Sequence, residues 1–397
     1  MAGVISIVGG GMVGASLALA LQRSHAGRDW RIRLIEALPP AANAWQPSYD
    51  ARSTALSWGS SQLLRELGVW AQLAERAEPI RHIHVSDRGH PGMLRMHAEQ
   101  EGVPALGYVV ENAWLGQVLL GALDQQRIDW LAPARATALQ PADQGYRLQV
   151  EGDGQSHWLD TDLLVLADGG RSGLLEQLGI HRQARPYGQT AIIANVSTSR
   201  AHQGEAFERF TADGPMALLP LVEQRSALVW TLPEDQARQV LALTDAAFLR
   251  RLQEAFGYRL GELLRVGERS SYPLQLIESD EQVRPHLVVL GNAAHSLHPI
   301  AGQGFNLSLR DAMALARHIR QAWAEQAAPG ELARLQAYLA EQRNDQRLTI
   351  DFSDRLTRLF SNRQTLLGAG RTLGLLGLDL LAPAKSLFAR RAMGLRS

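Results

Sequence analysis

The stretch LVVLGNAAHSLHPIAGQGFNLSLRDAMAL, from Leu287 to Leu315, decides the fold. Four apolar residues open it as a buried strand, a loop rich in glycine, alanine and proline follows, and helical spacing resumes at Asn306. Gly302 and Gly304 let a flat ligand approach the backbone, and a helix start offers unpaired N–H groups at the positive end of its dipole. The stretch predicts a pocket for a ligand with an anionic edge. An ordinary strand-to-helix loop is the alternative that composition leaves open.

A second strand-loop-helix unit opens the sequence. The apolar strand 4–8 leads into Gly9, Gly11 and Gly14, which fit the pattern G-x-G-x-x-G, and a later strand ends at Glu36, 36 − 14 = 22 residues after the last glycine. In such units the glycines let a pyrophosphate approach the helix start, and the acidic side chain binds a ribose. The spacing therefore predicts a dinucleotide site, without distinguishing FAD from NAD.

Two more polar residues stand next to predicted elements. Asp168 follows the apolar strand 163–167, at the strand end where α/β sheets bind ligands, and a helix cap is its alternative use. Arg52 precedes a predicted helix over 60–67, where it fits either a phosphate contact or a buried salt bridge.

The middle of the chain changes character. Strands dominate residues 185–275, with one predicted helix over 246–256, which indicates an inserted β-rich domain. Residues 80–98 alternate loosely and predict a hairpin outside the nucleotide fold, and helices are predicted over 314–326 and 331–344. Candidates for an apolar pocket, which fit an ordinary core equally well, are Phe210, Met216, Leu218, Leu219 and Trp230.

Composition excludes several classes of function. Among 397 residues, 40 are basic and 40 acidic, so nothing indicates a nucleic-acid partner. The absence of cysteine excludes disulfides and thiolate metal sites and fits a cytoplasmic protein. We expect no signal peptide, and no apolar run approaches the roughly 20 residues of a membrane span. Lys385 is the one lysine, which excludes a catalytic lysine within the main fold.

Three separated signals agree: the first glycine pattern with Glu36, the Asp168-Gly169 pair, and GNAAHSLHPIAGQGFN ahead of a helix. Together they resemble the FAD-dependent aromatic hydroxylases, the class A flavoprotein monooxygenases, over nearly the whole chain. The segments YDARSTALS, GYVVEN, GPMALLPL, LVWTLP, HPIAGQGFNLSLRDA and ARRAMGL are most similar to the ubiquinone-biosynthesis hydroxylases that act on 2-polyprenyl-6-methoxyphenols. The resemblance implies an α/β fold: a Rossmann-like FAD-binding domain, an inserted β-rich substrate domain as in para-hydroxybenzoate hydroxylase, and C-terminal helices.

The same resemblance divides the chain. We expect the FAD-binding domain in three parts, at 1–79, 106–182 and 278–326. The remaining segments are a substrate-domain hairpin at 80–105, the β-rich substrate domain at 183–277, and C-terminal helices and tail at 327–397.

The resemblance also assigns site residues. The implied cofactor contacts are Gly9, Gly11 and Gly14 for the pyrophosphate, Glu36 for the adenosine ribose, Arg52 for the phosphates, Asp168 near the nucleotide, Asn292 for the ribityl chain or pyrophosphate, and Gly302, Gln303, Gly304, Phe305 and Asn306 beside the isoalloxazine. Asn292 stands where most relatives have aspartate, so its contact should be weaker. Arginines usual in the family are replaced by Ala113 and Leu175, which removes two further contacts.

The implied chemistry belongs to the cofactor. NAD(P)H would reduce the flavin, O2 would add to form a C4a-hydroperoxyflavin, and a polyprenylated phenol would receive the oxygen. Pro299 would lie near the reacting edge of the phenol, and His298, like His295, would either relay a proton or make structural hydrogen bonds. Alternatives are another flavin-dependent aromatic hydroxylase, an isoprenoid reductase, or a non-catalytic FAD-binding scaffold of a biosynthetic complex.

The sequence from 366 to 395 is rich in leucine, and its charges are mainly basic, with Arg371, Lys385, Arg390 and Arg391 against the single acid Asp379. It fits an anionic membrane surface, or else helix packing on the main body of the chain or on another protein of ubiquinone biosynthesis. We therefore expect a cytoplasmic protein, with a peripheral position at the inner face of the membrane as one possibility.

Overall fold

The computed structural model describes residues 3–23, 30–38, 53–89, 92–297 and 302–360, together with 386, 389–390 and 393–394. Arg52, His298, Pro299 and most of the tail beyond 366 lie outside the described residues.

A mostly parallel sheet, in the order β19-β20-β12-β1-β2-β8, forms one half of the molecule. Its strands are β1 (Val4–Val8), β2 (Arg31–Ile35), β8 (Ile128–Leu131), β12 (Leu163–Leu166), β19 (Val283–Arg284) and β20 (Leu287–Val289). Every residue of β12 and β20 is buried, as expected for parallel strands covered on both faces. The loops after β1 and β12 leave the same end of neighbouring strands, which is where such sheets bind ligands.

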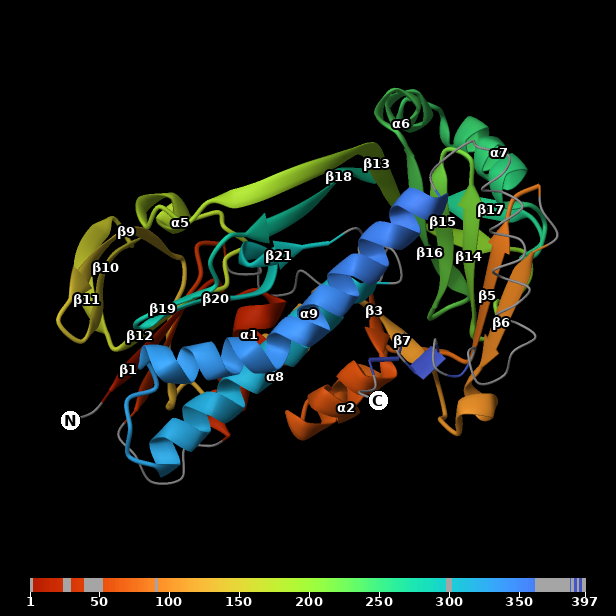
Figure 1. Cartoon of the computed structure of the whole chain (residues 1–397). Coiled ribbons are helices and arrows are strands. Elements are labelled where there is room, and N and C mark those ends of the chain that lie inside the picture. Colours follow the sequence, from red (N-terminus) through yellow and green to blue (C-terminus); the bar gives the residue numbers. More distant parts are fainter. Residues whose placement is uncertain are drawn as a thin grey trace.

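Different layers cover the two faces of this sheet (Figure 1). On one face α1 (Met12–Gln22), α4 (Asn112–Gly121) and α8 (Gln303–Ala324) share a core with β1 and β2. The other face packs against an antiparallel sheet of β9 (Ala134–Ala142), β10 (Gly145–Gly152) and β11 (Gln155–Thr161), with α5 (Leu174–Gln177) beside it. A ligand can therefore reach the parallel sheet only at its strand ends.

The second half is a large mixed sheet in the order β21-β18-β13-β16-β15-β14-β5-β6, with β17 paired to β13. Figure 1 shows β13 and β18 running from the first half to this sheet. Its strands are β5 (His82–Asp87), β6 (Met93–His97), β13 (Arg182–Thr198), β14 (Glu205–Thr211), β15 (Gly214–Leu221), β16 (Arg225–Pro233), β17 (Leu263–Val266), β18 (Ser270–Ser279) and β21 (His295–Ser296). The predicted hairpin is present, because β5 and β6 pair antiparallel.

The helix predicted over 246–256 is confirmed as α7 (Asp245–Phe256), but a second helix, α6 (Glu234–Leu241), was not predicted. Both cover one face of the large sheet. The sequence does mark the start of α6, by Pro233 directly before it and two acidic residues in its first turn, but the prediction did not use these signals. The helix predicted to end at 344 is α9 (Leu332–Phe360), which continues because no glycine or proline interrupts it.

Smaller elements join the two halves. A small antiparallel sheet contains β3 (Ser53–Ser57), β4 (Glu78–Ile80) and β7 (Gly107–Glu111), and the short helices are α2 (Trp58–Glu66), α3 (Trp70–Ala74), η1 (Ala98–Glu101) and η2 (Gly291–Ala293). At the end of β7, Glu111 forms a buried ion pair of 2.9 Å with Arg225 of β16. No helix in the described part of the chain has the length and apolarity required to cross a membrane.

Candidate active site

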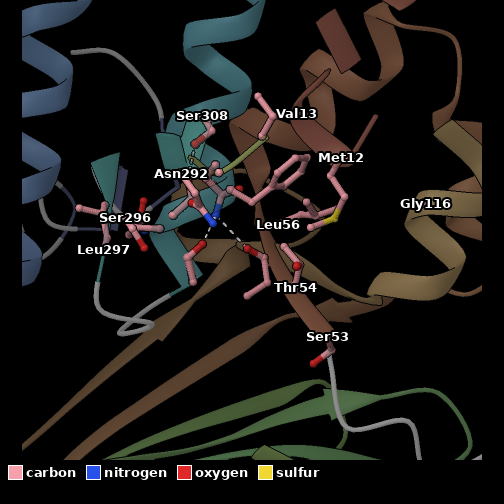
Figure 2. Close-up of a pocket in the computed structure, with 18 of the residues that line it drawn as sticks. Met12, Val13, Ser53, Thr54, Leu56, Gly116, Asn292, Ser296, Leu297 and Ser308 are labelled. Atoms are coloured by element: carbon pink, nitrogen blue, oxygen red, sulfur yellow. Dashed lines mark hydrogen bonds between the residues drawn. The ribbon is translucent and has the colours of Figure 1, made fainter. Parts of the chain in front are cut away.

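A cavity of about 1080 Å³ is lined by residues of both large sheets, of β3 and of the start of α8. Its volume exceeds the roughly 300–1000 Å³ usual for a single small-molecule site. Figure 2 looks into it and labels, among others, Met12 and Val13 of α1, Thr54 and Leu56 of β3, and Asn292, Ser296 and Leu297, which follow β20. The cavity therefore has room for a large cofactor and a second molecule.

The glycines between β1 and the first turn of α1 have different structural roles. Gly9 has φ +105°, and a Cβ there would lie 2.6 Å from the Cα of Asp168. At Gly14 a side chain would collide with the carbonyl oxygen of Gly9, so only glycine lets α1 approach β1 this closely. A Cβ at Gly11 would meet nothing within 4 Å, although this residue lines the cavity. The loop thus keeps open space directly at the start of α1.

Glu36 is held in position by this loop. Its Oε2 accepts a hydrogen bond from the N–H of Gly10 at 2.7 Å, and its Oε1 accepts one from the N–H of Leu38 at 2.8 Å. Each carboxylate oxygen has further acceptor capacity, and the side chain lines the cavity. The geometry suits the two hydroxyls of a ribose.

Asp168 combines both uses that the sequence left open. Its Oδ1 accepts from the N–H of Gly170 at 3.0 Å and its Oδ2 from the N–H of Ser172 at 2.6 Å, so it organises the turn ahead of α5. The residue also lines the cavity, where the exposed guanidinium groups of Arg135 and Arg171 accompany it. Neither arginine could be identified from the sequence, because Arg135 lies on a strand without a motif and Arg171 follows the Asp168-Gly169 pair without belonging to it.

The start of α8 is tied to β3 by one side chain. Asn306 Oδ1 accepts from the N–H of Ser57 at 2.9 Å, and its Nδ2 donates to the carbonyl oxygens of Ala55 and Gly302 at 2.8 and 2.7 Å. Gly302 has φ +61°, and a Cβ there would lie 2.8 Å from that of Ala55. At Gly304, by contrast, a Cβ would meet nothing within 4 Å. All five residues expected beside the isoalloxazine, 302–306, line the cavity.

Asn292 and His295 have contrasting surroundings. The side chain of Asn292 is exposed and lines the cavity, and its amide makes no hydrogen bond to another residue in the described part of the chain. His295 is buried outside the cavity lining, and its Nε2 lies 2.9 Å from Asp311 Oδ2, which also accepts from Gln346 at 3.0 Å. Of the two uses considered for His295, structural hydrogen bonding is therefore the one observed.

The far wall of the cavity is one face of the large sheet. Of the five predicted pocket residues, Phe210 and Leu219 line it. The other three, Met216, Leu218 and Trp230, are core residues beneath α6 and α7, which is the alternative that the sequence left open. Side chains alternate between the two faces of a strand, and the sequence does not say which face a helix covers.

A family model described as "FAD binding domain" matches residues 1–353. The chain belongs to this FAD-binding family. Ubiquinone hydroxylase UbiL of Rhodospirillum rubrum is 39% identical, over 98% of this chain and 89% of its own length. The 3-demethoxyubiquinol 3-hydroxylase of Escherichia coli is 32% identical, over 98% of both chains.

Solved structures share the fold of this family member. The p-nitrophenol 4-monooxygenase PnpA of Pseudomonas putida has a TM-score of 0.77 at 17% identity, over 100% of this chain and 99% of its own. PqsL of Pseudomonas aeruginosa, in complex with 2-aminobenzoylacetate, has a TM-score of 0.75 at 23% identity, over 95% of this chain and 100% of its own. The predicted α/β fold and the resemblance to FAD-dependent monooxygenases are confirmed. The chain is a flavin-dependent oxidoreductase of the monooxygenase class.

The described residues fit the FAD of this family. Two helix starts, those of α1 and α8, line a single cavity, and at each a glycine leaves space that a side chain would fill. Helix starts favour anionic groups, such as a pyrophosphate or the pyrimidine edge of a reduced flavin. Glu36 and the exposed amide of Asn292 add the polar contacts that a ribose and a ribityl chain require.

Proposed function

We propose that this enzyme hydroxylates a polyprenylated phenol of the 2-polyprenyl-6-methoxyphenol type in ubiquinone biosynthesis, with FAD, NAD(P)H and O2. The main support is the continuity of the cavity, whose lining passes from the glycine loop and Glu36, past the start of α8, to an apolar sheet face. The names of relatives at 39% and 32% identity, a ubiquinone hydroxylase and a 3-demethoxyubiquinol 3-hydroxylase, point to the same substrate class.

In this proposal each end of the cavity has its own task. Gly9, Gly11 and Gly14 would hold the pyrophosphate, with Glu36 on the adenosine ribose and Asn292 on the ribityl chain. Bound FAD would supply the redox chemistry, by accepting electrons from NAD(P)H and activating O2. The start of α8 would stabilise negative charge on the flavin edge, and the apolar wall would exclude water and hold the ring.

His298 and Pro299 keep their proposed positioning roles beside the reacting edge of the phenol. Leu297 and Gly302, which flank their segment in the sequence, both line the cavity. Arg52 keeps its proposed phosphate contact, because Ser53, the next residue, also lines the cavity. Replacement of His298 by Ala should alter the pH dependence of hydroxylation, and an unchanged profile would remove the relay role.

The test begins with the visible spectrum of the purified protein under nitrogen. NADPH or NADH is added with and without a 2-polyprenyl-6-methoxyphenol, and oxygen is then admitted. We expect flavin bleaching that the phenol accelerates, followed by a hydroxylated product. Bound FAD that neither nicotinamide reduces would contradict the proposal and favour a non-catalytic scaffold.

We infer that the basic, leucine-rich sequence 366–397 brings the enzyme to an anionic membrane surface, where a polyprenyl substrate resides. Deletion of these residues should shift the protein from the membrane fraction to the supernatant in a sedimentation assay. A truncated protein that sediments like the full chain would refute this location, and loss of a co-purifying protein instead would indicate a protein partner.

A further inference from the structure

Glu208 stands in the apolar wall of the cavity. It lies on β14, in register with Ala217 of β15 on one side and Val85 of β5 on the other. Its neighbours on the same strand face, Ala206 and Phe210, line the cavity as well. The cavity-lining residues that β5, β6, β13, β14, β15 and β16 contribute are otherwise apolar: Ile83, Val85, Leu94, Met96, Ile193, Ala206, Phe207, Phe210, Ala217, Leu219 and Val229. The carboxyl group of Glu208 is therefore the one polar side chain that these described strands contribute to an otherwise apolar cavity wall.

The carboxyl group of Glu208 has no protein partner among the described residues. In the described part of the chain, no backbone or side-chain group donates a hydrogen bond to Glu208 or forms an ion pair with it. The side chain is half-buried and lines the cavity. Burial raises the pKa of Glu208 to about 8. An unpartnered buried carboxyl is costly, so a use for it is expected.

Nearby charges do not compensate for this burial. Strand alternation sends Glu205 and Arg209 of β14, His84 of β5 and Arg95 of β6 to the opposite face of the sheet. There the ring of His84 packs 5.9 Å from that of Phe207. β15 carries no charged residue, and Asp87 of β5 shares the face of Glu208 but is buried outside the cavity lining. In the described part of the chain, no basic side chain of β5, β6, β14 or β15 lies beside Glu208 on the cavity face, where a ligand can reach it.

We propose that Glu208 is a catalytic residue, which accepts a hydrogen bond from the phenol hydroxyl and takes up its proton during hydroxylation. This inference rests on the proposed function, and it identifies Glu208 as the residue that makes the polar contact with the phenol in the substrate site. Bases with a pKa near the working pH transfer protons most effectively, and the raised pKa of Glu208 meets that condition. The apolar residues around it would hold the ring and its polyprenyl chain.

During hydroxylation the phenol O–H bond breaks and its proton passes to a carboxylate oxygen of Glu208. The electron pair of that bond raises the electron density of the ring. A ring carbon forms a bond to one oxygen atom of O2 as the O–O bond breaks, and the hydrogen on that carbon leaves as a proton when aromaticity returns. NAD(P)H, through FAD, supplies the two electrons that reduce the other oxygen atom to water. Glu208 then returns its proton to the product or to solvent.

The test compares FAD-loaded wild type with Glu208→Gln, which has nearly the same shape but cannot take up a proton. Glu208→Asp, which keeps a carboxyl one methylene shorter, is the conservative variant. Glu205→Gln, on the same strand but the opposite face, is the matched control. Two quantities are followed from pH 6 to 9.5: the ultraviolet difference spectrum of the bound phenol under nitrogen, which reports its ionisation, and the rate of hydroxylation in a single turnover.

We expect the wild-type rate to rise as the pH passes through about 8. Glu208→Gln should lose that rise and fall about 100-fold or more at pH 8. It should also change the pH at which the bound phenol ionises, because the phenol and the carboxyl of Glu208 no longer titrate as a pair, while flavin content and reduction by NAD(P)H stay unchanged. Glu208→Asp should keep the rise at a lower rate, and Glu205→Gln should behave like wild type.

Two results would contradict the assignment of Glu208 as the base, and they have different consequences for the proposed function. If wild type hydroxylates the phenol and Glu208→Gln matches its rate, pH profile and phenol spectrum, Glu208 is not the base, although the proposed function stands. If wild type itself neither binds nor hydroxylates the phenol, the proposed function fails, and the assignment fails with it. Flavin absorbance and circular dichroism establish that each variant is folded.

Discussion

At the residue scale, Asn306 shows how one amide builds the site. All three of its hydrogen bonds are made by the side chain: two join the first turn of α8 to β3, and the third reaches the carbonyl oxygen of Gly302 at the start of the helix. The bonds leave its amide little capacity for a ligand. We therefore interpret Asn306 as the residue that positions the helix start, although it also lines the cavity.

Replacement of Asn306 by Ala should weaken FAD retention and lower the free energy of unfolding. The change leaves a buried N–H of Ser57 without its acceptor, which costs about 1–3 kcal/mol. Asn306→Asp keeps that acceptor but loses the two donated bonds, so it should lie between wild type and the alanine variant. FAD released on dilution and urea unfolding give the two quantities. An alanine variant that matches wild type in both would contradict this role.

The pKa of Glu208 makes a separate stability prediction. Between the ordinary value of 4.5 and the folded value of about 8, the folded protein keeps a proton that the unfolded chain loses. Raising the pH across this window therefore favours unfolding, and the loss is complete above about 8. In urea unfolding at pH 5, 7 and 9, wild type should lose stability relative to Glu208→Gln as the pH rises. Parallel curves for the two proteins would show that the carboxyl ionises normally.

At the scale of elements, the helix-covered face of the large sheet gathers positive charge. His84 of β5 is buried there, and burial, followed by Arg259, Arg95 and Arg209, lowers its pKa to about 4. A neutral imidazole among arginines avoids a further charge in this cluster. The hairpin of β5 and β6, which forms part of the cavity wall, should therefore be sensitive to acid.

Acid sensitivity can be measured with His84→Phe. Between pH 6.5 and about 4 the unfolded chain binds a proton that folded His84 does not, so wild type should lose stability as the pH falls through this window. The phenylalanine variant should lose less, and His157→Phe, at an exposed position of β11, is the control. The measurement is the urea concentration at the midpoint of unfolding, for all three proteins, from pH 7 to pH 4. An equal slope in all three proteins would exclude His84 as the cause.

The same sheet shows where sequence reasoning about elements stops. The alternation in GPMALLPL predicts a strand, but Leu218 faces the α6 and α7 core while Leu219 faces the cavity. That choice depends on α6, whose start signals were overlooked, and on strand pairings between residues distant in the chain. Glycine loops were easier to predict, because strand, turn and helix are all local there.

At the scale of the whole molecule, the cavity exists only where the two large sheets meet. Gly9, Gly11, Glu36, Asp168 and residues 302–306 could all be predicted as parts of one site, because each follows a strand of the same parallel sheet or begins a helix beside it. Gly14, the third glycine of the pattern, lies outside the cavity lining and lets α1 pack against β1. Glu208 and Arg135 could not be predicted. Their roles depend on packing across the chain, and no local pattern marks them.

The ion pair between Glu111 and Arg225 should hold the two halves together. Both side chains are about 95% buried, so Arg225→Met leaves a lone buried carboxylate and should cost about 3–5 kcal/mol. The double variant Glu111→Gln/Arg225→Met should recover most of this loss. Arg147→Met, which breaks an exposed pair with Asp160, should cost only about 0–1 kcal/mol. Urea unfolding of the four proteins completes the comparison, and a loss no larger than that of Arg147→Met would rule out this role.

The central claim is that one cavity joins FAD to a polyprenylated phenol. The most direct test incubates the purified protein with FAD, NADPH, 2-polyprenyl-6-methoxyphenol and isotopically labelled O2, and analyses the product by mass spectrometry. The account predicts a phenol that has gained one labelled oxygen atom, with label absent when NADPH is omitted. Consumption of NADPH and O2 without a labelled phenol, or a product with oxygen from water, would contradict it.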